Sequence, residues 1–356
     1  MGPKATACSP FAVLSPYLIP AELAARKVVN LGDGFILRAI ERLVGKTDPG
    51  CLFSPRVAPT ATDRTRLQQC RGVILAGANQ LNDQYTVWPG LSADEIRESG
   101  LRLIPFGIGL HGQPGHNDGL SPAARDVLIA VHERLAFSSW RCPHTVAWLA
   151  REIPQVAAQL LMTGCPVLYD KPLLEGAAFG RRMGRIAVTV TERGRFWDRE
   201  TAVIDFVART FPRAERWLVL HQNYSPPPSW EWLHHRLVAR PGSGWNAYRK
   251  LRHHAVRRGF RIVAPPDADR CLAFYDTIDA HFGSRLHAHL LCLSRARRSW
   301  LVAVDGRAPG MAEYLQFPLC APEGIEAELD CDFERVRHNA TRTFPVMRQF
   351  VESLQP

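Results

Sequence analysis

The sequence predicts an α/β protein made of two Rossmann-like, doubly wound domains that face each other across a cleft. Short apolar runs alternate with amphipathic runs along the whole chain, and several apolar runs end in small-residue turns such as Gly77-Ala78-Asn79. Strand–turn–helix units in series are typical of parallel sheets covered by helices. The length of 356 residues is sufficient for two domains of ordinary size.

The first half of the chain, 1–172, is predicted to form the N-terminal domain. Continuous apolar runs indicate buried strands, and apolar residues at helical spacing indicate helices. The predicted strands are 11–14, 71–76, 101–108, 135–139 and 160–163, and the predicted helices are 34–44, 125–134 and 143–151.

A change in composition marks the domain boundary. The segment from Asp170 to Gly184 is rich in Gly, Lys and Arg and has no clear period, so we place a linker at 173–184. The strand–helix pattern then resumes over 185–331, which is predicted to form the C-terminal domain. An amphipathic helix within 332–356 has no strand after it and is able to pack back on the N-terminal domain.

Composition restricts the class of protein. Apolar residues make up 46% and charged residues 22%, which is typical of a soluble globular protein. The net charge of +10 is compatible with nucleic acid, an anionic membrane surface or an acidic small substrate, and also with solvated basic helix faces. The nine cysteines are dispersed without a CxxC pair, which favours a reducing cytoplasm over a disulfide framework. No apolar run approaches the roughly 20 residues of a membrane span. The histidines lack metal-site spacing, and no nucleic-acid-binding signature is present. Neither a bound metal ion nor a nucleic-acid partner is therefore expected.

One stretch near the C-terminus carries the strongest chemical signal. Gly283 and Ser284 follow a short apolar segment and precede an apolar helical run, so Ser284 is predicted to be the N-cap of a helix. Arg285 and His287 would then lie at the helix start, where backbone N–H groups and the helix dipole favour an anion. The alternative is that these side chains cap the helix or bridge to the other domain.

A second candidate site lies near the N-terminus, where Asn30, Gly32 and Asp33 precede a long predicted helix. Gly32 would let the backbone approach a ligand closely. Asp33 either binds the substrate or only caps the helix, since an aspartate at a helix start is commonly a cap.

The order of these motifs resembles the polysaccharide pyruvyl transferase family over about Asn30 to Leu315. The Arg-Leu-His-Ala of 285–288 is the most specific element and the Asn-Leu-Gly-Asp of 30–33 the second. The remaining elements are VILAGANQL, PFGIGLHG, SSWRCPHTVAWL, TGCPVLYD and LVAVDGRAPGMAEYL.

The resemblance implies a fold like that of GT-B glycosyltransferases. It also implies transfer of the pyruvyl group of phosphoenolpyruvate to a sugar as a ketal, with no cofactor and no metal. Arg285, His287 and Arg141 match family residues, and Arg307 stands where many members have a lysine. Asn79 introduces a side chain into a turn that is usually glycine-rich, and it joins Ser284 among the expected substrate-binding residues.

On this hypothesis, Arg141 and Arg285 bind the phosphate and carboxylate of phosphoenolpyruvate bidentately. His287 is the acid/base, because an imidazole both gives and accepts protons near neutral pH. The saccharide acceptor is open, and a lipid-linked saccharide at the inner membrane face is compatible with a basic cytoplasmic enzyme. Two alternatives stay open: a GT-B glycosyltransferase using a nucleotide sugar, and a non-catalytic basic protein that binds nucleic acid or an anionic glycan.

Overall fold

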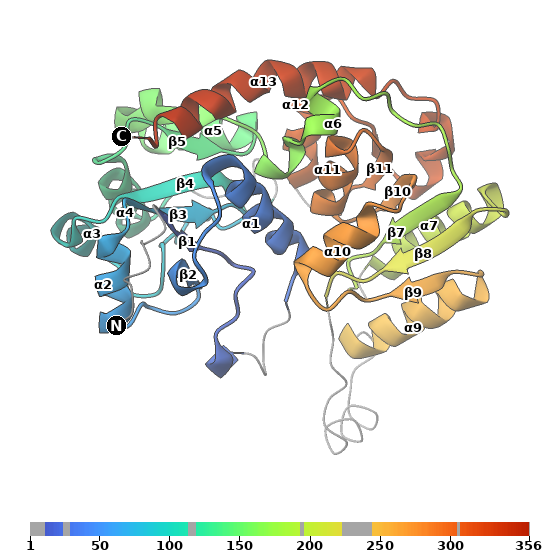
Figure 1. Cartoon of the computed structure of the whole chain (residues 1–356), viewed down its shortest axis with the longest axis horizontal. Coiled ribbons are helices and arrows are strands. Elements are labelled where there is room, and N and C mark those ends of the chain that lie inside the picture. Colours follow the sequence, from blue (N-terminus) through green and yellow to red (C-terminus); the bar gives the residue numbers. More distant parts are fainter. Residues whose placement is uncertain are drawn as a thin grey trace, which may run out of the picture.

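The computed structural model of the chain describes residues 11–23, 29–112, 119–192, 196–222, 244–304 and 307–355 (Figure 1). Within them, the chain forms two six-stranded parallel sheets, each flanked by helices. The predicted pair of doubly wound α/β domains is therefore confirmed.

The N-terminal sheet has the order β2-β1-β3-β4-β5-β6. Its strands are β1 (Phe11–Leu14), β2 (Leu52–Phe53), β3 (Gly72–Ala76), β4 (Leu103–Ile108), β5 (Ser138–Trp140) and β6 (Leu160–Met162). The helices of this domain are α1 (Leu31–Val44), α2 (Ala61–Gln69), α3 (Ala93–Ser99), α4 (Pro122–His132) and α5 (Pro143–Glu152). The prediction missed β2 because two residues show no period, and it missed α2 because this helix buries Leu67 alone.

The C-terminal sheet has the order β12-β11-β10-β7-β8-β9. Its strands are β7 (Arg185–Thr189), β8 (Glu215–Val219), β9 (Arg261–Val263), β10 (Ala280–Gly283), β11 (Arg298–Val302) and β12 (Leu319–Cys320). The chain builds outward from β7 through β8 to β9 and then crosses to β10 on the other side of β7. The order therefore reverses between β7 and β10, and ligands of open α/β sheets bind at the carboxyl ends of the strands at such a point.

The helices of the second half are α7 (Trp197–Thr210), α9 (Gly244–Arg257), α10 (Ala268–Tyr275), α11 (Leu286–Ser294), α12 (Arg307–Leu315) and α13 (Glu334–Glu352). Between the two sheets, α6 (Lys171–Leu174) follows the short 3-10 helix Pro166–Leu168. Figure 1 shows α13 running from the C-terminal lobe across to the N-terminal lobe. There the ring of Phe350 packs edge-on against Phe106 at 4.9 Å, and Arg102 donates a hydrogen bond to the Ser353 carbonyl.

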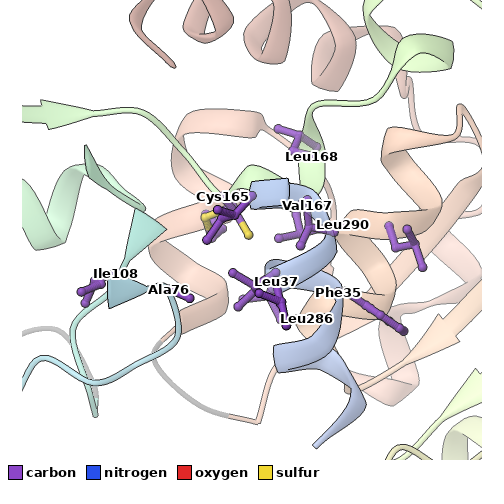
Figure 2. Packing of buried hydrophobic residues seen from close by; sticks show 14 of the residues in the cluster. Phe35, Leu37, Ala76, Ile108, Cys165, Val167, Leu168, Leu286 and Leu290 are labelled. Atoms are coloured by element: carbon purple, nitrogen blue, oxygen red, sulfur yellow. The ribbon is translucent and has the colours of Figure 1, made fainter. Parts of the chain in front are cut away.

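The buried apolar residues form one cluster that spans both domains. Figure 2 shows α1 and α11 packed together, with Leu37 beside Leu286 and with Val167 of the segment before α6 close by. Gly34 lets α1 cross α10 closely, because a Cβ at that position would lie 2.5 Å from the Cβ of Ala268. The packing of α1 against α10 and α11 brings the first turn of α1 to the carboxyl edge of the C-terminal sheet.

Replacing Phe350 by alanine should lower the free energy of unfolding by about 3–5 kcal/mol, the usual cost of removing a buried phenylalanine. The ring is fully buried and contacts Phe106, so its loss leaves a cavity between α13 and the N-terminal sheet. Urea titration followed by circular dichroism measures the change. Gln349→Ala, at an exposed position of the same helix, should change stability by less than about 0.5 kcal/mol. Equal stabilities for the two variants would contradict the docking of α13 on this sheet.

Candidate functional site

The candidate site lies where the C-terminal sheet reverses its strand order, at the passage from β10 to α11. Gly283 has φ 134°, and a Cβ there would lie 2.1 Å from the Thr189 carbonyl oxygen of β7, so only glycine fits. The Ser284 amide donates to that same carbonyl at 3.1 Å. The helix begins one residue later than predicted. Its N-cap is Arg285 and not Ser284, and no side chain of the described residues caps it.

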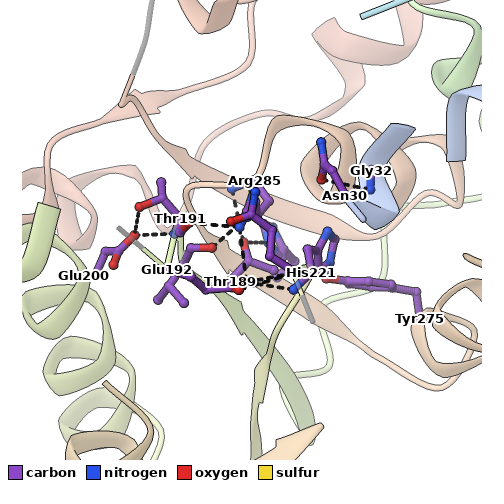
Figure 3. Close-up of polar contacts among 12 residues, drawn as sticks. Asn30, Gly32, Thr189, Thr191, Glu192, Glu200, His221, Tyr275 and Arg285 are labelled. Atoms are coloured by element: carbon purple, nitrogen blue, oxygen red, sulfur yellow. Dashed lines mark hydrogen bonds and ion pairs between the residues drawn. The ribbon is translucent and has the colours of Figure 1, made fainter. Parts of the chain in front are cut away.

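Arg285 is held by protein groups on one side of its guanidinium (Figure 3). Its Nε donates to the Val190 carbonyl at 2.7 Å, and its Nη2 donates to the Thr191 carbonyl at 3.0 Å and to the Glu192 carboxylate at 3.1 Å. Within the described part of the chain, Nη1 donates to no acceptor. A ligand can therefore accept a hydrogen bond from Nη1 of this guanidinium. The bidentate contact that the sequence predicts is limited to the N–H groups of that one nitrogen.

Glu192 is the anion that holds Arg285. Its carboxylate is fully buried and accepts hydrogen bonds from the backbone amides of His221 and Gln222 as well as from Arg285. Burial raises the pKa of Glu192, and the Arg285 charge opposes this rise. The backbone is left-handed here, with φ 62°, a conformation that costs a non-glycine residue free energy and is found at constrained sites.

The first turn of α1 reaches this site from the other domain. Asn30 is the N-cap, and its side chain accepts a hydrogen bond from the Gly32 amide at 3.3 Å. Gly32 and Asp33 therefore lie inside the helix and not before it, and the cap role belongs to Asn30. The Leu31 amide donates to the His221 carbonyl at 3.1 Å, which ties α1 to the end of β8.

Gly32 and His287 are in direct contact across the domain interface. A Cβ at Gly32 would lie 2.9 Å from Nδ1 of His287, so a side chain there would displace the imidazole. His287 is buried, with 4% of its surface exposed. The structure thus brings together the two most specific motifs, which are far apart in the sequence.

The other buried histidines of this region are kept neutral. Burial lowers the pKa of His221 well below its ordinary value, and the charge of Arg285 and the imidazoles of His281 and His287 lower it further. The Nε2 of His221 lies 2.9 Å from the Tyr275 hydroxyl. His281 has its pKa lowered to about 3 by burial.

His289 belongs to the interior of the domain. A chain of hydrogen bonds connects Thr189 to His281 at 2.8 Å, His281 to Ser299 at 2.7 Å and Ser299 to His289 at 2.7 Å. This arrangement gives His289 a structural role.

Glu200 of α7 is a buried acid that the sequence did not identify. Its Oε1 accepts hydrogen bonds from the amide and the hydroxyl of Thr191, the residue whose carbonyl binds Arg285. Burial raises the pKa of Glu200 to about 7, against the opposing effect of these hydrogen bonds. An acid in the first turn of a helix is commonly a solvated residue that complements the helix dipole, so sequence alone carried no signal for it.

The other predicted residues lie in or next to the N-terminal domain. Arg141 follows β5, is 1% exposed and lies across Gly109, where a Cβ would approach its Nη2 to 2.0 Å. Asn79, half-buried, follows β3, and among the described residues its side chain has no hydrogen-bond partner. Arg307 is the first residue of α12, and its side chain lies outside the described residues. Trp230 and Trp232 also lie outside the described residues.

The helix α12 connects the Arg141 region to the C-terminal domain. A Cβ at Gly310 would lie 2.9 Å from Sγ of Cys142, and a Cβ at Gly164 would lie 2.6 Å from the Tyr314 hydroxyl. His144 and Glu313 add an ion pair of 2.5 Å between the domains. The first half of α12 thus lies close to Cys142, the residue after Arg141.

Two kinds of feature are absent from the described residues. No group of three or more His, Cys, Asp and Glu side chains is arranged to hold a metal ion. No described helix has both the length and the apolar character that a membrane span requires.

The chain has two parallel α/β domains that are joined at the carboxyl edges of their sheets, and a cationic helix start lies at the reversal point. This arrangement defines a two-domain Rossmann-like protein of the GT-B type. The sequence profile of the family described as polysaccharide pyruvyl transferase matches residues 30–306. The chain belongs to this family.

A solved structure has the same fold. UDP-GlcNAc 2-epimerase from Neisseria meningitidis bound to UDP-GlcNAc is similar with a TM-score of 0.50 and 10% identity, over 89% of this chain and 88% of that chain. The Methanocaldococcus jannaschii UDP-GlcNAc 2-epimerase in complex with UDP-GlcNAc and UDP has a TM-score of 0.48 and 11% identity, over 88% and 87%. No curated protein matches the sequence significantly. At such low identity the likeness to these structures concerns the fold alone.

Replacing Glu192 by alanine should lower the free energy of unfolding by about 3–5 kcal/mol, because it leaves the buried Arg285 charge without its anion. Thermal and urea unfolding measure this loss. The matched control is Glu313→Ala, which removes a carboxylate that is 60% exposed and should cost about 1 kcal/mol or less. A Glu192→Ala protein as stable as the control would show that the pair does not organise the site.

Glu200→Gln should change the pH dependence of stability. The folded protein binds the Glu200 proton more tightly than the unfolded chain, because the pKa is raised from 4.5 to about 7. The resulting stabilisation is present in full below pH 4.5 and is lost as the pH rises through about 7.

Between pH 5 and pH 8 the wild type should therefore lose about 2–3 kcal/mol relative to Glu200→Gln. Unfolding free energies of both proteins at the two pH values give this difference. Glu98→Gln, at an exposed position of α3, should show no such change. A constant difference between wild type and Glu200→Gln over this pH range would contradict the raised pKa.

Proposed function

We propose that this protein transfers the pyruvyl group of phosphoenolpyruvate to a saccharide acceptor as a ketal. The observation that carries the proposal is the contact between Gly32 and His287 at the uncapped start of α11. It joins the two motifs that characterise the family at the reversal point of the C-terminal sheet. The family membership supports a transferase, and the donor and the acceptor are our inference.

The start of α11 suits the phosphate of the donor. The first-turn amides of a helix have no intrahelical partner, and here no described side chain caps them. Arg285 adds a fixed positive charge whose Nη1 end is not used by the described residues. Phosphate charge that develops as the C–O bond breaks would be stabilised by these groups without rearrangement.

The reaction needs a proton on the methylene carbon of phosphoenolpyruvate. One acceptor hydroxyl then adds to the neighbouring carbon, and a second hydroxyl displaces phosphate from it. The two acceptor hydroxyls release two protons. One replaces the proton that was added to the methylene carbon to form the methyl group, and the other leaves with phosphate. We assign His287 the proton transfers, because its ring lies against α1 at the helix start.

The residues of the facing domain have secondary roles in the proposal. Arg141 provides a second buried cation at the carboxyl edge of the N-terminal sheet, suited to the donor carboxylate. Asn79 offers an amide that is not used by the described protein, and Asp33 in the first turn of α1 is buried. We assign Asn79 and Asp33 to the acceptor, which we propose to be a saccharide, lipid-linked in the simplest case.

A nucleotide-sugar reaction is the alternative that the fold alone would allow. Glycosyl donors of this type are commonly held through hydroxyl groups by carboxylates. Of the acids at this edge, Glu192 and Glu200 are buried and hydrogen bonded to the protein, and Asp33 is buried in the first turn of α1. The geometry therefore favours phosphoenolpyruvate over a nucleotide sugar.

Phosphoenolpyruvate should raise the melting temperature of the wild type by several degrees at saturation, because a ligand of the folded state stabilises it. The rise should be lost in Arg285→Lys, which keeps the charge beside Glu192 and removes the Nη1 end. His338→Gln, at an exposed position of α13, is the control and should keep the full shift. A shift with nucleotide sugars and none with phosphoenolpyruvate would contradict the proposal.

His287→Gln should separate binding from chemistry. The thermal shift with phosphoenolpyruvate should remain, while phosphate release in the presence of a panel of saccharide acceptors should fall by about 10²–10⁴-fold. Phosphate release is followed by a colorimetric assay, and His338→Gln again serves as the control. Unchanged turnover in His287→Gln would remove this residue from the mechanism.

A further inference from the structure

A basic groove lies on the C-terminal domain, between α7 and α9. It has a volume of about 850 Å³, and its described lining consists of Trp197 and basic side chains of the α9 segment. Among these, His254 and Arg258 are neutralised by Asp205 of α7, at 2.8 Å and 2.7 Å. The groove is outside the site described above, and neither the family nor the proposed reaction assigns a role to it.

Three cations of the basic groove have no counter-ion in the described part of the chain: Arg249, Lys250 and Arg257. All three are exposed. An isolated cluster of this kind holds a positive potential over the surface that attracts anions. The cluster can therefore attract an anionic partner.

The outward face of α9 also carries an apolar side chain. Leu251 and Ala255 are fully buried against the domain, so the opposite face, with Arg249, His253 and Val256, is turned to solvent. Val256 is 55% exposed, and no other large hydrophobic side chain of the described residues is exposed. Trp197, partly buried at the groove, contacts His254 edge-on.

We propose that the basic groove and the outward face of α9 dock on an anionic phospholipid bilayer. Several Lys and Arg side chains on an amphipathic helix are the pattern that binds anionic headgroups. The exposed Val256, on the same outward face as Arg249, suits the boundary between headgroups and acyl chains. A free anionic glycan or a nucleic acid would match the charge but would gain nothing from Val256.

Figure 1 shows that α9 lies at the outer edge of the C-terminal lobe beside β9, away from α13. Docking through α9 would thus leave α13 and its contacts with the N-terminal sheet undisturbed. The inference rests on this surface and not on pyruvyl transfer. It is tested without substrate, so its failure and the failure of the proposed reaction are independent.

Co-sedimentation of the full chain with vesicles tests the inference. The protein should pellet with vesicles of 30% phosphatidylglycerol in phosphatidylcholine, should stay in solution with pure phosphatidylcholine, and should be released by 1 M salt. Each basic side chain near such a surface contributes about fivefold to the partition coefficient. Arg249→Glu/Lys250→Glu should therefore weaken binding at least tenfold.

The matched control is Arg64→Glu/Arg66→Glu, which makes the same change in net charge at exposed positions of α2. It should weaken binding by less than about threefold, since the charge is then lost far from α9. Equal melting temperatures show that both variants are folded. Equal losses in the two variants would overturn the inference. Binding to phosphatidylcholine alone, or groove-dependent binding of polyphosphate or RNA without binding to vesicles, would also overturn it.

Discussion

The buried ion pair between Arg285 and Glu192 is the interaction on which the site depends. The guanidinium binds two carbonyls that follow β7, and the carboxylate binds two amides that follow β8. The pair therefore fixes the start of α11 to the ends of two neighbouring strands. The carbonyl of His221, held in this way, accepts the Leu31 amide of the other domain. One charged pair thus sets where α1 meets α11 and hence where Gly32 meets His287.

Such a pair is costly, because both charges lose water. The chain offsets the cost by using most of the hydrogen-bonding capacity of both groups, and it accepts a left-handed backbone at Glu192. The positive charge that remains at Arg285 also helps to keep His221 neutral. The result is a rigid cationic site with neutral imidazoles beside it. A preorganised arrangement of this kind suits a reaction in which phosphate charge develops.

The sequence predicted the fold well, because apolar runs and their turns mark the strands of parallel sheets. The motif residues Arg285 and His287 were found for the same reason, since they follow a strand and a glycine turn. Glu192 was missed because its pairing spans 93 positions and its left-handed backbone is not marked by a glycine. The sequence predicts Ser284 as the N-cap because serine is a common cap residue. In the structure the Ser284 amide donates to the Thr189 carbonyl, and the helix begins after Arg285.

The central claim is that phosphoenolpyruvate binds at the start of α11. Its most direct test is a crystal structure of the protein soaked with phosphoenolpyruvate. The account predicts phosphate density at the first-turn amides of α11, in contact with the Nη1 end of Arg285, and the methylene carbon within reach of His287. Density for the ligand elsewhere, or an empty α11 start at saturating phosphoenolpyruvate, would contradict the account.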